Sequence, residues 1–328
     1  MNNLQLTEIC NIYASLGSRM VSPFNWIDAG SAGSTDLYLL PFFCLPGVTI
    51  LVDGREESSS RITRLFEEYG LPLKSDLQSY EGYIDSESRV RQFFVNAGGS
   101  TFYPSKDESL RFISDFRDEF QTKLVQTTRL EDVVSSILDS GISFCKVDIE
   151  GSEHDFVDAL SKFAQEKLPF AIEIEVNVGR TDCQESFGDF ISKLDRLGFR
   201  LCDLRRSHLT VTSEFWTKLP SNEASTIISP VYQGVLCQFD GFFINQKLLT
   251  EQNLSFDALM HIFCILSAYR QFPLIAKLVE HNKLINGEQK RLMEDAIESL
   301  TRVLTEVWQN NPYSIAGLHP YFNWLKQR

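Results

Sequence analysis

A short strand that ends abruptly in carboxylates most constrains how this chain can fold. Phe144 to Val147 form a short, largely apolar run, and the next six residues, Asp148 to Glu153, contain three carboxylates and a glycine. Charge cannot remain in a core unless it is used or solvated. In an open α/β sheet, the carboxyl ends of the strands are where ligands bind. The segment therefore predicts a strand that delivers Asp148 to a functional edge.

A purely structural interpretation of the same segment is a strand followed by a helix N-terminus. Acidic residues are favoured near the positive end of the helix dipole, which accounts well for Glu150 and Glu153. It accounts poorly for Asp148, which lies before the expected helix.

A glycine turn upstream indicates a ligand as well. Trp26 to Ser34 predict a strand that ends at Asp28, followed by a turn with Gly30 and Gly33 and a helix. Glycines let a backbone approach a ligand closely, because they lack a Cβ. The spacing is D-x-G-x-x-G, whereas dinucleotide-binding turns have G-x-G-x-x-G. An acidic residue before the turn suits a ligand with an amino group and a sulfonium better than a pyrophosphate.

A second acidic residue lies at the distance expected for ribose recognition. The β-branched run Val48 to Val52 ends at Asp53, about 20 residues after the glycine turn. An acidic residue at this spacing commonly bonds ribose hydroxyls. Because Asp-Gly pairs also favour turns, Asp53 with Gly54 is equally compatible with a structural role.

Together these residues resemble the FkbM family of methyltransferases. The resemblance rests on the Asp28–Gly33 turn, on Asp53, and on the block from Lys146 to Glu153, which follows the family pattern K-x-D-x-E-G-x-E. Thr128 to Asp132, Ile172 to Val176 and Leu197 to Phe199 extend it, so that it covers about residues 20–245.

The resemblance implies a Rossmann-like class I methyltransferase fold with S-adenosyl-L-methionine as the methyl donor. It implies that Asp28, Gly30, Ser31, Gly33 and Asp53 bind the cofactor. Asn96, at the end of a strand, is then expected near the adenine. Such enzymes typically O-methylate a hydroxyl of a sugar, a glycan or a small metabolite.

Methyl transfer requires the nucleophile, methyl and sulfur to be held in line, and an alcohol acceptor also needs a base. Asp148 is the first candidate for this base, and Glu150 and Glu175 are the next. Alternatively, Asp148 and Glu175 with Asn177 hold Mg²⁺ or Mn²⁺, which acidifies the hydroxyl.

Histidines and arginines offer further candidates. His154 is expected on the surface of the helix after the acidic block, and His208 in a loop beyond a strand at residues 200–204. Arg205 and Arg206 are able to hold an acidic group of a substrate or simply to be solvated.

The alternation of strands and helices predicts a doubly wound, mostly parallel seven-stranded α/β sheet. The expected strands cover residues 25–28, 48–53, 91–95, 143–147, 170–176, 200–204 and 241–245. The stretches at residues 70–90, 98–122 and 205–235 are expected to be loops that shape the acceptor pocket. Beyond residue 248 the pattern is helical only, which predicts a methyltransferase domain over 1–248 and an all-helical extension over 249–328. The extension is expected to act as a cap, a lid or a dimer interface.

The composition of the chain limits the kinds of partner that it is expected to bind. The formal net charge is −13, which disfavours nucleic acids and anionic membrane surfaces. The seven cysteines form no C-x-x-C pair, and the N-terminus has no secretory pattern. The longest apolar stretch, Leu37 to Val52, is broken by prolines and predicts no membrane insertion. The sequence thus predicts a cytoplasmic protein, and homo-oligomerisation stays open.

Two other functions remain. One is a nicotinamide-dependent oxidoreductase, against which the missing glycine and Asp28 argue. The other is a non-catalytic binding module on the same fold. The presence of all five expected site residues argues against it, namely Asp28, Gly30, Gly33, Asp53 and Asp148.

Overall fold

The computed structural model of the chain describes residues 3–30, 36, 38–53, 58–96, 99–101, 121–149, 151–177, 186–210, 235–250 and 253–310. For some of these, Asp53, Asn96 and Asn177 among them, only the backbone is described.

A seven-stranded sheet with the order β10-β11-β9-β8-β1-β2-β3 forms the centre of the molecule. Its strands are β1 (Trp26–Ala29), β2 (Gly47–Asp53), β3 (Ser75–Glu81), β8 (Phe144–Val147), β9 (Ala171–Asn177), β10 (Phe199–Thr210) and β11 (Val235–Asn245). All neighbours from β3 to β9 pair in parallel, and only β11 runs antiparallel to its neighbours. The predicted doubly wound, mostly parallel sheet is therefore confirmed.

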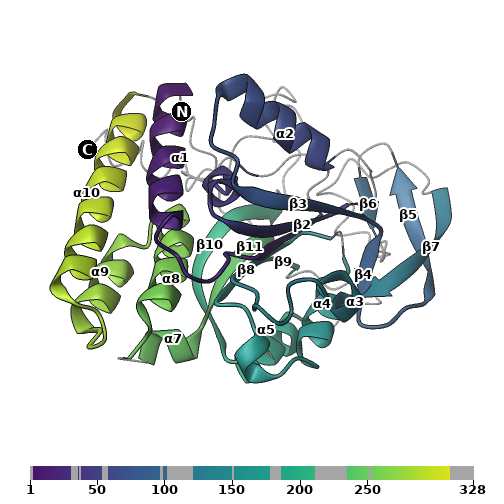
Figure 1. Cartoon of the computed structure of the whole chain (residues 1–328). Coiled ribbons are helices and arrows are strands. Elements are labelled where there is room, and N and C mark those ends of the chain that lie inside the picture. The colour runs from purple at the N-terminus through teal and green to yellow at the C-terminus, as the bar shows by residue number, and fades with distance from the viewer. Residues whose placement is uncertain are drawn as a thin grey trace.

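Helices cover both faces of this sheet (Figure 1). The α-helices (α) and 3-10 helices (η) described before β10 are α1 (Asn3–Gly17), η1 (Leu40–Cys44), α2 (Ser58–Tyr69), α3 (Leu130–Val133), α4 (Glu153–Leu160), η3 (Gln165–Lys167) and α5 (Phe187–Arg196). After β11 follow α7 (Gln246–Thr250), α8 (Phe256–Ala268), α9 (Phe272–His281) and α10 (Gly287–Asn310). In the described part of the chain, no helix is both long and apolar enough to cross a membrane.

Alternating side chains of the strands divide the core into two layers. Trp26 and Phe144 point into the layer that α1, α2 and the C-terminal helices cover, whereas Ile27 and Cys145 point into the layer below α3, α4 and α5. The C-terminal helices belong to the first layer rather than to a core of their own. Residues 259–268 of α8 are all buried, and the hydroxyl of Tyr13 donates a hydrogen bond of 2.9 Å to the carbonyl of Cys264.

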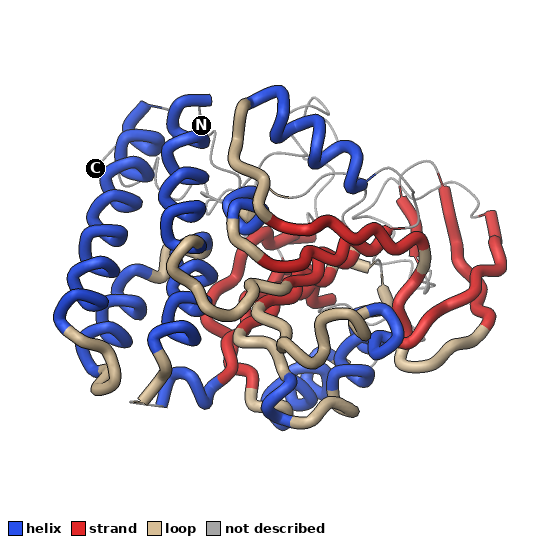
Figure 2. The backbone as a smooth tube through the Cα atoms, viewed as in Figure 1, coloured by secondary structure: helices blue, strands red, loops and turns tan. Residues whose placement is uncertain are grey.

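A second sheet departs from the predicted organisation. It contains β4 (Tyr83–Asp85), β5 (Val90–Asn96), β6 (Gly99–Thr101) and β7 (Gln121–Arg129) in the order β4-β7-β5-β6. Figure 2 shows it on the side of the main sheet opposite the C-terminal helices. The strand expected at residues 91–95 is thus not part of the main sheet, whose seventh strand is β3 instead. The exposure of side chains alternates at the start of β5, where Arg91 and Phe93 are more buried than Val90 and Gln92, which is typical of an antiparallel strand with one face outward.

Two further expectations were wrong. Residues 70–90 are not one loop, because they contain β3 and β4. The strand expected at 200–204 continues as β10 to Thr210, so Arg205, Arg206 and His208 lie in a strand rather than in a loop.

Two arginines attach the second sheet to α4. The guanidinium of Arg91 lies 3.0 Å from Asp85 and 2.5 Å from Asp155, and Arg89 contacts the same two carboxylates. Burial raises the pKa of Asp85, but the hydrogen bonds and charges of the two arginines outweigh it and hold this pKa below its ordinary value. The Asp85 side chain is fully buried, so it depends on these partners.

We predict that Arg91→Met lowers the free energy of unfolding by about 2–4 kcal/mol at pH 7, because it removes one of the two arginine partners from each of two buried carboxylates, Asp85 and Asp155. Urea denaturation measures this. The pKa of Asp85 is depressed in the folded state, so its stabilisation is present above the ordinary pKa of aspartate and is lost as the pH falls through the folded value. The difference between variant and wild type should therefore shrink in acid. Arg129→Met is the matched control, because Arg129 and its partner Asp132 are 52% and 47% exposed, and an equal loss there would contradict the prediction.

Candidate functional site

The loops after β1 and β8 meet at the carboxyl end of the main sheet. The N–H of Gly30 donates to the carbonyl of Val52 over 2.8 Å, and the N–H of Asp148 donates to the carbonyl of Ala29 over 2.9 Å. Gly30 has a φ of +88°, and a Cβ on it would lie 1.6 Å from the carbonyl oxygen of Asp148. The first glycine of the turn is therefore required by the protein's own backbone, whatever it does for a ligand. β1 and β8 are also where the strand order reverses, which is the usual ligand crevice of such sheets.

Three charged residues lie side by side across the central strands just before this crevice. In the strand register, Lys146 of β8 is opposite Asp28 of β1 on one side and Glu173 of β9 on the other. Paired residues of neighbouring strands point to the same face. All three are buried, with exposed fractions of 0% for Asp28, 7% for Lys146 and 1% for Glu173. We call Asp28, Lys146 and Glu173 the charged row.

Lys146 connects the charged row to Asp148. Its Nζ lies 3.1 Å from Oδ2 of Asp148, whose side chain is 27% exposed and so is the more accessible partner. Burial alone lowers the pKa of Lys146, but the attraction of Asp148, Asp28 and Glu173 outweighs it and raises this pKa above its ordinary value. Lys146 therefore remains an ammonium at neutral pH and does not act as a base. Three carboxylates around one ammonium leave two formal negative charges.

Two tyrosines from distant parts of the chain hold Glu173. The hydroxyl of Tyr38 donates to Oε1 and that of Tyr269 donates to Oε2, each over 2.5 Å. Tyr38 follows the glycine turn, and Tyr269 follows α8 in the C-terminal helices. The ring of Tyr269 stacks on Phe242 with centroids 3.8 Å apart and an interplanar angle of 11°. The C-terminal region thus contributes a side chain to this site.

Glu153 organises the loop that carries Asp148. Its Oε1 accepts hydrogen bonds from the N–H groups of Ile149 and Gly151, over 3.0 Å and 3.2 Å. Burial raises the pKa of Glu153 to about 8 against the effect of these bonds, and the nearby charge of Asp148 adds to the rise. The carboxylate expected merely to favour the helix N-terminus therefore fixes the loop between β8 and α4.

The predicted site residues divide into three groups. Asp28, Gly30 and Asp148 come together at the carboxyl ends of β1 and β8. Asp53 ends β2, Glu175 lies half-buried in β9 opposite Asp240, and Asn177 ends β9. Ser31, Gly33 and Glu150 lie outside the described residues.

Two other predicted residues have surroundings that differ from expectation. Asn96 ends β5 of the second sheet rather than a strand of the main sheet. His154 is half-buried rather than on the surface, with its ring 4.5 Å from that of Phe190.

Lys146, Glu173, Tyr38 and Tyr269 were not predicted as site residues. Lys146 and Glu173 carried a usable signal, because each is a charge inside an otherwise apolar strand. The tyrosines carried none, since Glu173 is 135 residues from Tyr38 and 96 from Tyr269.

A metal ion has no support from the described residues, among which no group of three or more His, Cys, Asp or Glu side chains could hold one. Asp148, the first predicted ligand, instead pairs with the ammonium of Lys146. That ammonium would repel a divalent cation at the same oxygen.

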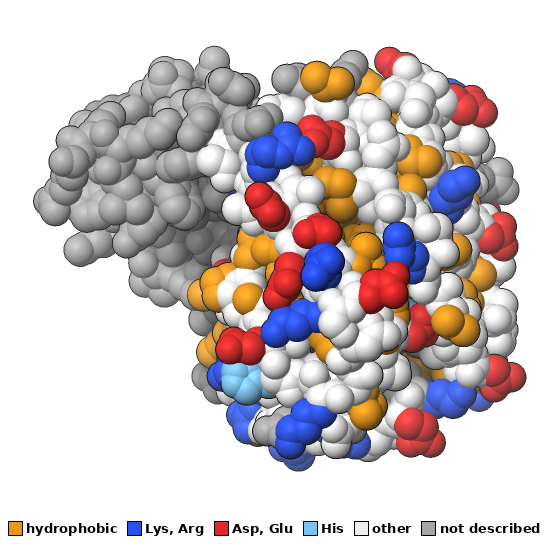
Figure 3. Space-filling view, turned by 60° about the vertical axis from the view of Figure 1, so that its left-hand side comes forward, with side chains coloured by type: hydrophobic (Ala, Val, Ile, Leu, Met, Phe, Trp, Pro, Cys, Tyr) orange, Lys and Arg blue, Asp and Glu red, His pale blue; other side chains and the backbone are white. Residues whose placement is uncertain are grey.

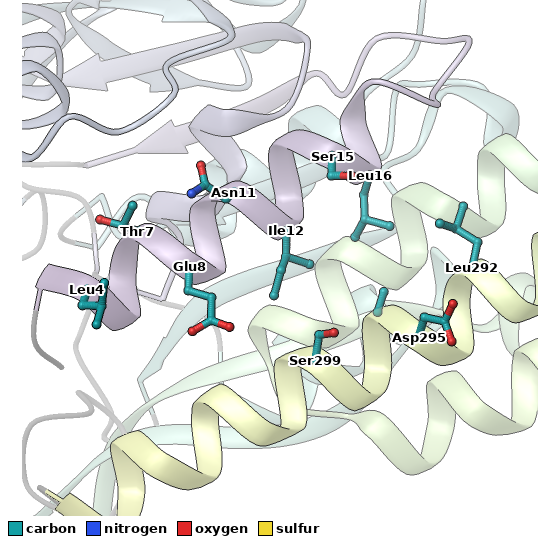
Figure 4. Close-up of a pocket in the computed structure, with 11 residues that line it drawn as sticks. Leu4, Thr7, Glu8, Asn11, Ile12, Ser15, Leu16, Leu292, Asp295 and Ser299 are labelled. Atoms are coloured by element: carbon teal, nitrogen blue, oxygen red, sulfur yellow. The ribbon is translucent and has the colours of Figure 1, made fainter.

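A hollow of about 520 Å³ lies elsewhere, between α1 and α10 (Figure 4). Leucines and small polar side chains line it, with Glu8 and Asp295 as its charged members. None of the residues of the charged row lines it. On the face shown in Figure 3, the described acidic and basic side chains are interspersed, with no extended patch of one sign.

Comparisons with known proteins agree with the sequence pattern. The family model described as the methyltransferase FkbM domain matches residues 54–201. This range contains the block from Lys146 to Glu153 and the whole of β9, and the resemblance is confirmed there. The match begins after Asp53, so the glycine turn lies outside it. No curated protein matches the chain.

Three solved structures illustrate the structural similarities. A protein of the NADB-Rossmann superfamily from Streptococcus agalactiae is 11% identical with a TM-score of 0.31, over 90% of this chain and 96% of that one. An rRNA methylase from Streptococcus thermophilus is 10% identical with a TM-score of 0.29, over 72% and 93%. TrmK from M. capricolum, in complex with S-adenosyl-homocysteine, is 7% identical with a TM-score of 0.28, over 89% and 96%. These similarities are weak, and the fold rests on the topology of this chain's own sheet.

We predict that Gly30→Ala destabilises the protein far more than Gly141→Ala does. Both glycines have a φ of +88°, but a Cβ at Gly141 meets nothing within 4 Å. The backbone strain, about 1–2 kcal/mol, is thus common to both, and only Gly30→Ala forces the two loops apart. Thermal unfolding of both variants measures the difference. Equal melting temperatures would show that the contact between the loops is unimportant.

We also predict that the pH dependence of stability reflects Glu153. Its pKa is raised in the folded state, so its contribution is fully present below the ordinary pKa of glutamate and is lost as the pH rises through about 8. Glu153→Gln resembles the protonated form. Relative to this variant, the wild type should therefore lose on the order of 2–4 kcal/mol between about pH 5 and pH 9. Denaturant unfolding across this range measures it, and a constant offset between the two proteins would contradict the assignment.

Proposed function

We propose that this chain, whose residues 54–201 form an FkbM methyltransferase domain, is an S-adenosyl-L-methionine-dependent methyltransferase that acts on a hydroxyl of a sugar, a glycan or a small metabolite. One observation carries the choice of donor. At the carboxyl ends of the central strands, the charged row and Asp148 combine three carboxylates with one ammonium. Such a surplus of negative charge fits a ligand with a sulfonium and an amino group.

When bound, S-adenosyl-L-methionine would supply the methyl group of its sulfonium to the acceptor oxygen, and the electron pair of the broken carbon–sulfur bond would stay on sulfur. Asp28 and the turn at Gly30, Ser31 and Gly33 would hold the amino-acid end of the donor. Asp53 at the end of β2 would bond the ribose hydroxyls. These residues follow neighbouring strands, so one ligand can span them.

Asp148 is the base that this arrangement supports best. It is the accessible member of its ion pair, and Lys146 fixes one of its oxygens. The hydroxyl proton of the acceptor would pass to the Asp148 carboxylate as the bond to the methyl carbon forms. Glu175, half-buried on β9, and Glu150 are the alternative bases.

The charge of the site works against a nicotinamide dinucleotide. Its pyrophosphate needs donors and positive charge at the turn after β1. Here Asp28 lies buried directly before that turn, with Glu173 and Asp148 close to Lys146.

We predict that Asp148→Asn and Asp53→Ala separate catalysis from binding. Asp148→Asn should lower turnover by about 10²–10⁴-fold through loss of the base. Asp53→Ala should weaken donor binding by about tenfold or more through loss of its bonds to the ribose. Calorimetric titration with S-adenosyl-L-methionine measures binding, and transfer of a labelled methyl group to a panel of sugars and hydroxylated metabolites measures turnover. Unchanged turnover in Asp148→Asn would remove it from the catalytic role, and binding of NADH in place of S-adenosyl-L-methionine would overturn the proposed function.

A further inference from the structure

We propose that Glu173 is a specificity-determining residue of this site, which maintains the surplus negative charge that favours a sulfonium ligand over the neutral thioether left after transfer. This inference rests on the proposed function. It assigns a role to Glu173, to the two tyrosines that hold it, and to the C-terminal helices that supply one of them.

Lys146 by itself would neutralise the charge of Asp148. Lys146 donates a hydrogen bond to Asp148 over 3.1 Å, and an isolated pair of this kind would cancel the charge of Asp148. Such a pair offers little attraction to a cationic ligand. Asp148 can present net negative charge only if other carboxylates share the ammonium.

The strand register places Glu173 beside Lys146. Glu173 and Asp28 flank Lys146 from the two neighbouring strands, so the ammonium has a carboxylate on either side as well as Asp148 ahead of it. Removing the charge of Glu173 would reduce the surplus from two formal negative charges to one. Because the row is buried, neither water nor salt screens this change strongly.

Two hydrogen bonds hold the carboxylate of Glu173 in its position. Each of its oxygens accepts a hydrogen bond from a tyrosine hydroxyl, Oε1 from Tyr38 and Oε2 from Tyr269. Tyr269 is itself fixed by stacking on Phe242 and by an edge contact of its ring with Tyr38. Both donors are satisfied by the carboxylate, which therefore stays beside Lys146 as a fixed charge.

The fixed charge of Glu173 would act differently on the two forms of the cofactor. S-adenosyl-L-methionine has a positive charge on sulfur, and S-adenosyl-homocysteine has none there. A fixed negative charge near the sulfur stabilises the sulfonium, which only S-adenosyl-L-methionine has, whereas its attraction for the amino group is common to both ligands. Loss of the Glu173 charge should therefore change the ratio of the two affinities, whereas a general loss of structure would weaken both.

Glu173→Gln in the full chain tests the proposal. The amide keeps the shape of the side chain and can accept from one tyrosine and donate to the other. Calorimetric titration at pH 7.5 gives the dissociation constants of S-adenosyl-L-methionine and S-adenosyl-homocysteine. We expect their ratio to shift toward S-adenosyl-homocysteine by about fivefold relative to the wild type. Tyr269→Phe, which retains the stacked ring, should shift it in the same direction by less.

Glu8→Gln is the matched control, because it removes the same charge from an exposed pair with Arg302 on the helical side of the molecule. The ratio of the two dissociation constants in Glu8→Gln should equal that of the wild type. An unchanged ratio in Glu173→Gln, with both ligands still bound, would overturn the inference and leave the proposed function intact. If the wild type bound neither ligand, the proposed function itself would be overturned. Should Glu173→Gln fail to fold by circular dichroism, the double variant Tyr38→Phe and Tyr269→Phe decides by the same ratio.

Discussion

The ammonium of Lys146, buried in the middle of the main sheet, is the interaction on which the site depends. An isolated ammonium in such a place is prohibitively costly, so the surrounding carboxylates are required for the strand to fold as it does. Asp28 and Glu173 meet this requirement from the neighbouring strands, and Asp148 meets it from the loop ahead. There are three carboxylates and only one ammonium. The carboxylates that make the burial of Lys146 tolerable therefore also leave the crevice with a net negative charge. Structural need and ligand preference therefore have one electrostatic origin.

Around this centre, backbone contacts fix the loops that a ligand would touch. Gly30 leaves the space in which the carbonyl of Asp148 lies, and the buried carboxyl of Glu153 binds two N–H groups of the loop beyond it. Gly30 and Asp148, which belong to separate motifs in the sequence, are thus in direct backbone contact. A ligand bound at one of them would meet an arrangement already set by the other, which is the preorganisation that transfer chemistry needs.

The elements outside the central sheet support the site in different ways. The C-terminal helices share the core of the sheet and supply Tyr269, so their connection to the site is a direct hydrogen bond to Glu173. The second sheet is attached through Arg89 and Arg91 to Asp155 of α4, the helix that begins at Glu153. The C-terminal helices and the second sheet therefore both contact elements that carry site residues.

The sequence by itself determined the fold class and the edge at which the chemistry lies. Alternating strands and helices require a parallel sheet, and a strand that ends at Asp148 can place its charge only at the carboxyl edge. It did not determine that β3, rather than the strand at 91–95, completes the main sheet, because strand pairing depends on partners far along the chain. Only the tertiary structure placed Lys146 between Asp28 and Glu173, since a register that differed by one residue would have turned these side chains to opposite faces. It also brought Tyr38 and Tyr269 to one carboxylate, a contact between residues too distant in sequence for any local pattern to encode.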